Sequence, residues 1–368
     1  MNVKTVSRQY NNNPLKDPSS PIRSSWLSRW PNWAPYAAAV WSLLYGVLGS
    51  YWVMGGAGFP FGENDVRGHM MGSFLVDLRA DTGGAVIIIA GLIGAAVAMA
   101  MVRLWSHRIV RSVLLAFAWS MCAVLIVMIP DVRVLQNFAY AFMLYFDLLD
   151  WPVVNQVLCM AGGFLWGAAA LAYQRRTRGA CMNCGRTDAG QGASSITAAR
   201  WGKWVTYIAV VTALPYGIVR LAWAAGIPLG VSVSDPTWIA SQSLSGRMVE
   251  AVLGGLPIGG AILTLGLIQR WGEIFPRWCL FLAGKRVPIW FAVIPAAFVS
   301  ALMTFAGFKL YIHWFSNGFV TRENWGELGP TLFWLPWGIS LGAAALAYYL
   351  RRRRTCRHCG LNGIAISE

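Results

Sequence analysis

Charged side chains are scarce in this sequence. Asp, Glu, Lys and Arg make up 12% of the 368 residues, while hydrophobic residues make up 57%. An ordinary soluble domain has about 25% charged and roughly 45–50% apolar residues. The composition is therefore that of an integral membrane protein and not that of a soluble domain.

Histidines and nucleotide-binding motifs are also scarce. The only histidines are His69, His107, His313 and His358, and none lies in the middle of a predicted membrane helix, where a b-type haem would need its ligands. The sequence has no Walker loop, no dinucleotide-binding fingerprint and no GxSxG between a strand and a helix. We therefore expect neither haem nor a nucleotide as cofactor.

The N-terminus lacks the short apolar core and small-residue cleavage site of a secretory signal, so we expect no cleaved signal peptide. Residues 1–30 are instead polar, rich in Asn, Pro and Ser, and carry five basic residues against one acid. This pattern is typical of a disordered tail.

Eight apolar segments follow the tail, each close to the roughly 20 residues that a helix needs to span the hydrocarbon core. The 20 Trp residues are expected to mark the headgroup level at the helix ends. The segment Phe138–Tyr145 is also apolar and aromatic, and we interpret it as an interfacial or re-entrant piece. The predicted spans are residues 35–55, 83–103, 111–130, 152–174, 204–224, 249–269, 288–309 and 330–350.

The basic residues lie on alternate sides of these segments. With the N-terminus in the cytoplasm, 23 of the 30 Lys and Arg residues fall on the inner side, and 11 of the 15 acids fall on the outer side. Positive charge is retained in the cytoplasm, so both termini are predicted to be cytoplasmic in a bacterial-type plasma membrane. The net charge of +15 is thus a topology signal that favours contact with anionic lipid headgroups and argues against nucleic-acid binding.

The chain carries one stretch twice. Gly167–Gly185 and Gly342–Gly360 agree at 12 of 19 positions, and both run from an apolar helix end through arginines into Cys-x-x-Cys-Gly. The start of the unit recurs as well. Trp33, Tyr36, Tyr45, Gly46, Trp52 and Gly55 have counterparts 171 residues later, at Trp204, Tyr207, Tyr216, Gly217, Trp223 and Gly226.

A duplicated unit with four helices keeps the same orientation in both copies. The predicted fold is therefore an all-α integral membrane protein with eight transmembrane helices, arranged as two parallel four-helix repeats. The predicted boundaries are a tail at 1–30, the first repeat at 31–186, a cytoplasmic linker at 187–200, the second repeat at 201–361 and a tail at 362–368.

The two cysteine pairs are the best candidate for a cofactor site. Cys181 and Cys184 follow the fourth span, and Cys356 and Cys359 follow the eighth. Disulfides are disfavoured in the cytoplasm, whereas four thiolates are the complement of a structural zinc site. We expect one zinc ion shared by both repeats. Thiol redox activity, metal binding shared with another subunit, and no metal at all are the alternatives.

A second candidate site lies near the outer ends of the second repeat. Arg220 falls late in the fifth span and Glu250 begins the sixth at the same level, and membrane-embedded charges are costly enough to indicate function. The pair is a candidate site for a small amphipathic or cationic molecule that the protein binds or transports. The alternative is a structural salt bridge.

The first outer loop holds the only candidate catalytic group. His69 with Asp65, Asp77 or Asp81 offers acids and one imidazole for acid–base work or metal binding, although no HExxH-type spacing supports it. An integral-membrane enzyme that acts on a lipid or lipid-linked substrate at the outer face is the alternative function, and simple solvation of the loop is the structural alternative. The pattern favours a non-enzymatic protein.

Overall fold

The protein is described here by a computed structural model. It describes residues 29–68, 71–103, 107–187, 193–317 and 325–353, together with Cys356 and Cys359. All regular structure in these residues is helical, and a single isolated β-bridge joins Ile274 and Arg286. The prediction of an all-helical chain is confirmed for the described residues.

Seven helices in the described part are long and apolar enough to cross a membrane. A further long helix, α1 (Trp30–Val53), is rich in Trp and Tyr, which have low hydropathy, and is not among the seven. The seven comprise α2 (Ala80–Ala100), α3 (Arg108–Ala123) with the π-helical turn η3 (Val124–Met128), α5 (Trp151–Thr177), α6 (Ala193–Ala224), α8 (Leu244–Leu265), α9 (Ile289–Asn317) and α11 (Trp334–Arg352), preceded by α10 (Trp325–Leu328) and the 3-10 turn η7 (Gly329–Phe333).

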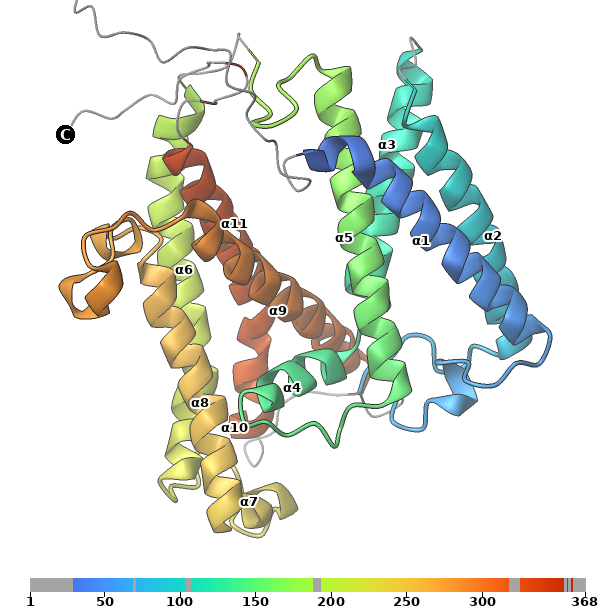
Figure 1. Cartoon of the computed structure of the whole chain (residues 1–368). Coiled ribbons are helices and arrows are strands. Elements are labelled where there is room, and N and C mark those ends of the chain that lie inside the picture. The colour runs from blue at the N-terminus through green and yellow to red at the C-terminus, as the bar shows by residue number, and fades with distance from the viewer. Residues whose placement is uncertain are drawn as a thin grey trace, which may run out of the picture.

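The long helices form two groups, one with α1, α2, α3 and α5 and the other with α6, α8, α9 and α11 (Figure 1). Within each group the first helix packs on the second, the first on the fourth, and the third on the fourth. The groups therefore share one packing pattern, in the same order along the chain.

Glycines allow the first two helices of each group to approach closely. A Cβ at Gly49 of α1 would lie 2.8 Å from the carbonyl oxygen of Gly84 in α2, and a Cβ at Gly254 of α8 would lie 3.0 Å from the carbonyl oxygen of Gly217 in α6. Backbone contact at these crossings replaces side-chain interdigitation, as is common between helices in lipid.

The two groups are joined at one end by the short helix α4 (Val132–Ala141). Val134 and Leu135 of α4 belong to the same buried apolar cluster as Leu302 and Phe305 of α9. The expected interfacial segment overlaps α4, where Phe138 packs edge-to-face on a phenylalanine of α9. The first part of the segment, up to Ala141, is thus the end of a short helix between the groups, and the rest continues as a turn.

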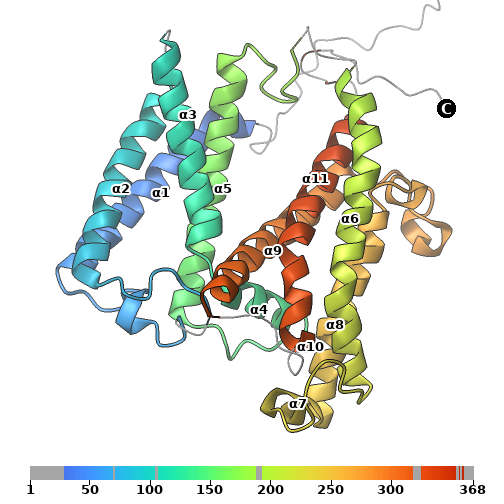
Figure 2. The ribbon, with the colours of Figure 1, turned by 180° about the vertical axis from the view of Figure 1, so that it is seen from behind.

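At the opposite end lie the start of α1, the end of α5, the start of α6 and the end of α11 (Figures 1 and 2). The Arg175 guanidinium of α5 lies 5.1 Å from the ring centroid of Trp30, the first residue of α1. Residues 193–200 of the expected linker are the first turns of α6, because Ala, the strongest helix former, recurs there. The helix therefore starts before its apolar part.

Candidate metal centre

The two cysteine pairs come together at the end of the molecule where α5 and α11 finish. The Sγ atoms of Cys181 and Cys356 lie 3.9 Å apart, and those of Cys184 and Cys359 lie 3.6 Å apart. All four Sγ atoms lie within 4.8 Å of one another. A tetrahedral zinc with Zn–S bonds of about 2.3 Å has sulfur–sulfur edges of about 3.8 Å. The four thiols thus have the spacing to hold one metal ion.

The first pair is presented by a tight turn that follows α5. Gly179 and Gly185 have φ values of +63° and +71°, which favour glycine because they are left-handed. The Cys181 amide donates to the carbonyl of Arg186 at 2.9 Å, and the Gly185 amide donates to the carbonyl of Cys181 at 2.7 Å. The turn therefore closes on itself with both thiols on one side, next to the second pair.

Arginine side chains tie this turn to the other group of helices. Arg186 donates to the carbonyl of Arg353 at 3.1 Å, and Arg353 donates to the carbonyl of Cys184 at 3.3 Å. Arg175 donates to the carbonyl of Met182 at 2.8 Å. A zinc ion with four thiolates carries two negative charges, and these guanidinium groups would offset them.

Burial disfavours the thiolate form of Cys184. Burial, together with hydrogen bonds from the neighbouring cysteines, raises the pKa of the Cys184 thiol to about 12. A metal ion reverses this balance because its charge stabilises the thiolates and releases their protons. A metal ion at the cluster would therefore lower the pKa of the Cys184 thiol.

Arg220 and Glu250 form a largely buried ion pair, with side chains that are 15% and 8% exposed. Nη1 of Arg220 donates to both carboxylate oxygens of Glu250 at 3.0 Å. The same guanidinium lies 5.0 Å and 4.8 Å from the ring centroids of Tyr216 and Trp223. Glu250 is 6% exposed, so desolvation makes this pair sensitive to the loss of either partner.

The candidate catalytic acids that the structure describes lie in different surroundings. His69 lies outside the described residues. Asp77 and Asp81 are exposed, and Asp81 pairs with Arg79 at 3.4 Å. Asp65, in contrast, is buried and accepts hydrogen bonds from both terminal nitrogens of Arg133 on α4, at 2.6 Å and 2.5 Å. Its carboxylate is therefore engaged in a structural contact.

Arg133 is the centre of a buried polar network that the sequence reasoning missed. It is fully buried and also pairs with Asp131, the N-cap residue of α4. The Gln156 side chain of α5 donates to Asp131 at 2.8 Å and accepts from its amide at 3.0 Å. The available signal was the sequence Asp131-Val-Arg133 directly after an apolar span, which is a costly place for unpaired charge.

Lys309 was missed as well. It lies in α9, is 1% exposed, and donates to the carbonyl of Met128 at 2.7 Å. Met128 ends the π-helical turn after α3, where carbonyls lack intrahelical partners. The ammonium also lies 3.3 Å from the ring centroid of Phe74. Lys309 thus links the two groups near Asp131, and its charge within a long apolar run was the signal.

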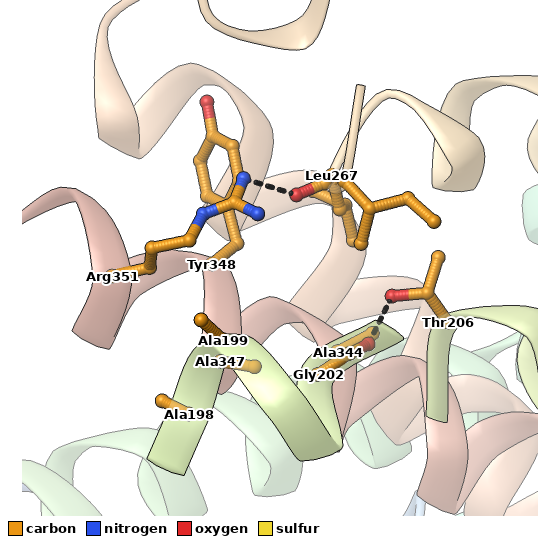
Figure 3. Close-up of a pocket in the computed structure, with 10 residues that line it drawn as sticks. Ala198, Ala199, Gly202, Thr206, Leu267, Ala344, Ala347, Tyr348 and Arg351 are labelled. Carbon is orange, nitrogen blue, oxygen red and sulfur yellow. Dashed lines mark hydrogen bonds between the residues drawn. The ribbon is translucent and has the colours of Figure 1, made fainter. Parts of the chain in front are cut away.

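One small pocket lies between α6, α11 and the start of the α8–α9 loop (Figure 3). Its walls are mostly small side chains, including Ala198, Ala344 and Gly202. Two of its polar side chains already make hydrogen bonds. The Thr206 hydroxyl donates to the carbonyl of Gly202, and the Arg351 guanidinium donates to the carbonyl of Leu267. The pocket therefore presents no unsatisfied group for a substrate.

These arrangements define a multi-pass helical protein with a four-cysteine cluster that has the donor set for a metal ion. No protein-family model, no curated protein and no solved structure matches the chain.

Proposed function

We propose that Cys181, Cys184, Cys356 and Cys359 bind one structural zinc ion that clasps the two groups of helices together. The observation that carries this proposal is the cross-group pairing of the sulfurs, at 3.9 Å and 3.6 Å. Each cysteine pair lies next to the cysteine pair of the other helix group. Thiol redox motifs of this kind usually gain reactivity from a following helix N-terminus, whereas Cys181 and Cys184 follow a helix C-terminus.

We also propose that the two groups are parallel repeats and that α1 is an eighth span. The shared packing order of the two groups supports a duplication. The contact of Trp30 with Arg175 supports placing the start of α1 at the cysteine end. The basic residues gather at that end, which favours a cytoplasmic location for it and for both termini, in a bacterial-type plasma membrane.

For the activity, we propose that the protein binds or transports a small amphipathic or cationic molecule between the repeats. Arg220 supports a specialised second repeat, since its counterpart in the first is Gly49. The enzyme alternative is weakened because Asp65 is bound to Arg133. It would now rest on His69 with Asp77 or Asp81.

The zinc proposal predicts one zinc ion per chain. Purified protein should contain one equivalent by elemental analysis, and its four cluster thiols should resist alkylation in the folded state until a chelator is added. Cys279→Ser is a matched control, since Cys279 lies in the α8–α9 loop, outside the cluster, and it should leave the zinc content unchanged. Metal-free protein with four freely alkylated thiols would contradict the proposal.

The ligand proposal predicts separable effects at the buried ion pair. Glu250→Gln leaves Arg220 buried without a counter-charge and should lower the free energy of unfolding by about 3 kcal/mol. The double change Arg220→Met with Glu250→Leu should restore much of that stability, because replacing a buried pair with apolar residues is often neutral.

The double variant then tests function apart from folding. It should fail to complement deletion of the gene in cells, because the charged ligand contact is gone. Arg79→Met, which breaks the exposed pair of Arg79 with Asp81, should complement. Full complementation by the Arg220 and Glu250 double variant would assign the pair a structural role only and would refute it as a ligand site.

A further inference from the structure

The loop between α8 and α9 is much longer than its counterpart in the first group. It comprises the 23 residues 266–288, whereas the seven residues 101–107 connect α2 to α3. Both loops join the second long helix of a group to the third. The additional residues are therefore a feature of the second group alone, and they require an explanation beyond connecting two helices.

The α8–α9 loop is folded and fixed to α11. Amides of Phe275 and Val287 donate to the carbonyls of Lys285 and Glu273, each at 2.9 Å. Arg351 of α11 donates to the Leu267 carbonyl at 2.8 Å, a contact drawn in Figure 3, and pairs with Glu273 at 2.9 Å. The base of the loop is thus held at the helix end that carries the cysteine cluster.

The tip of this loop carries apolar side chains that nothing in the described part of the chain covers. Leu280, Phe281 and Leu282 are 76%, 89% and 46% exposed. Leu280 has a φ of +39°, a conformation that is unfavourable for a branched side chain. The hydrogen-bonded base therefore holds the apolar tip outward instead of letting it collapse onto the helices.

The loop is also strongly basic. Residues 266–288 contain four basic residues and one acid, Glu273, which is paired with Arg351. The four cations flank the apolar tip in sequence and are all exposed. They are Arg270, Arg277, Lys285 and Arg286.

We propose that the α8–α9 loop is a binding site for anionic phospholipid headgroups of the membrane that the helices span. Both flanking helices are membrane-length, so the loop lies at a membrane surface. Figure 1 shows that it projects sideways from the second group, away from the first. Its cations contact lipid phosphates, while Leu280, Phe281 and Leu282 enter the boundary between headgroups and acyl chains, as amphipathic interfacial segments do.

The test is hydrogen–deuterium exchange of loop peptides in the full-length protein. The protein is placed in nanodiscs of phosphatidylcholine alone or of an equal mixture with phosphatidylglycerol. Amides of residues 277–286 should exchange at least about fivefold more slowly in the anionic discs, the effect of a single cation near an anionic surface. The difference should shrink in high salt, which screens surface charges.

Two variants separate charge from insertion. Arg277→Gln, Lys285→Gln and Arg286→Gln together should abolish the dependence on lipid charge, and Phe281→Ser should speed exchange in anionic discs without removing any charge. A control triple variant should keep the wild-type difference, because it removes three exposed cations from the same end of the molecule. That control is Arg103→Gln, Arg108→Gln and Lys203→Gln.

Equal exchange in both lipids would overturn the proposal. Equal protection of the loop in detergent without any lipid would also overturn it. So would protection that grows with protein concentration, since a second copy of the chain would then cover the tip. Neither outcome bears on the zinc content, so the lipid site and the zinc clasp are tested independently.

Discussion

Arg133→Met is expected to lower the free energy of unfolding by about 3–5 kcal/mol, because it leaves two buried carboxylates without their counter-charge. Asp65 and Asp131 are 5% and 0% exposed, so water cannot replace the guanidinium. Burial alone would lower the pKa of Arg133, but its hydrogen bonds to Asp131 and Asp65 raise it above the ordinary value. The Arg133 guanidinium therefore keeps its positive charge at any physiological pH.

Thermal or denaturant unfolding in detergent measures this effect. Arg79→Met is the control, since Arg79 pairs with Asp81 at the same end of the molecule but its side chain is 75% exposed. It should change stability by less than about 0.5 kcal/mol. Adding Asp65→Asn and Asp131→Asn to Arg133→Met should recover part of the loss, because the stranded charges are removed. An Arg133 variant as stable as the wild type would show that the network does not hold the fold.

The Arg133 network explains how the end of the molecule opposite the cysteine cluster is assembled. It brings together the loop before α2 through Asp65, the start of α4 through Asp131, and α5 through Gln156. With α4 held in this way, its apolar face packs against α9 of the other group. The loop before α2, which the sequence indicated as a candidate catalytic site, therefore contributes its buried acid to the joint between the groups.

The long helices could be predicted because the signal for them is local. A membrane span needs only an uninterrupted apolar run, and seven such runs became membrane-length helices. α1 shows the limit of that signal. Its Trp and Tyr residues have low hydropathy, although the helix is as long as its neighbours. The cysteine cluster could also be predicted from sequence. The same Cys-x-x-Cys-Gly motif follows the last helix of each repeat, so the two copies indicate each other as partners.

The partners of buried charges could not be predicted in this way. Arg133 and Asp65 are 68 residues apart, and no local pattern links them, because their contact depends on how α4 enters between the helices. Lys309 meets a carbonyl 181 residues earlier in the chain. Sequence alone shows that such a charge must be neutralised, but the neutralising group follows from tertiary packing.

The two ends of the molecule are thus held by different means. At the end that holds α4, buried ion pairs and apolar packing join the groups, and these contacts cannot be removed without changing the chain. At the other end, the contacts between the cysteine turns include two arginine–carbonyl hydrogen bonds and the approach of the four sulfurs. A metal ion bound there would be removable, so under the zinc proposal the joint at the cysteine end is expected to depend on zinc.

Substitutions in the two cysteine pairs are therefore expected to be non-additive. Cys181→Ser and Cys356→Ser should each abolish zinc binding and remove about 4 kcal/mol of stability when free zinc is a thousandfold above its dissociation constant. The double variant should be no less stable than either single variant, because one shared ion can be lost only once. A double-mutant cycle measured by thermal unfolding in the presence of zinc gives this coupling.

The same cycle distinguishes a shared ion from separate sites. If each pair bound its own ion, each single variant would retain one zinc and the two losses would add. If the cysteines bound no metal, a chelator would leave the stability of the wild type unchanged. The shared clasp predicts instead that a chelator destabilises the wild type and the Cys279→Ser control equally, and that it has no effect on either ligand variant, because these variants already lack the ion that joins the two groups.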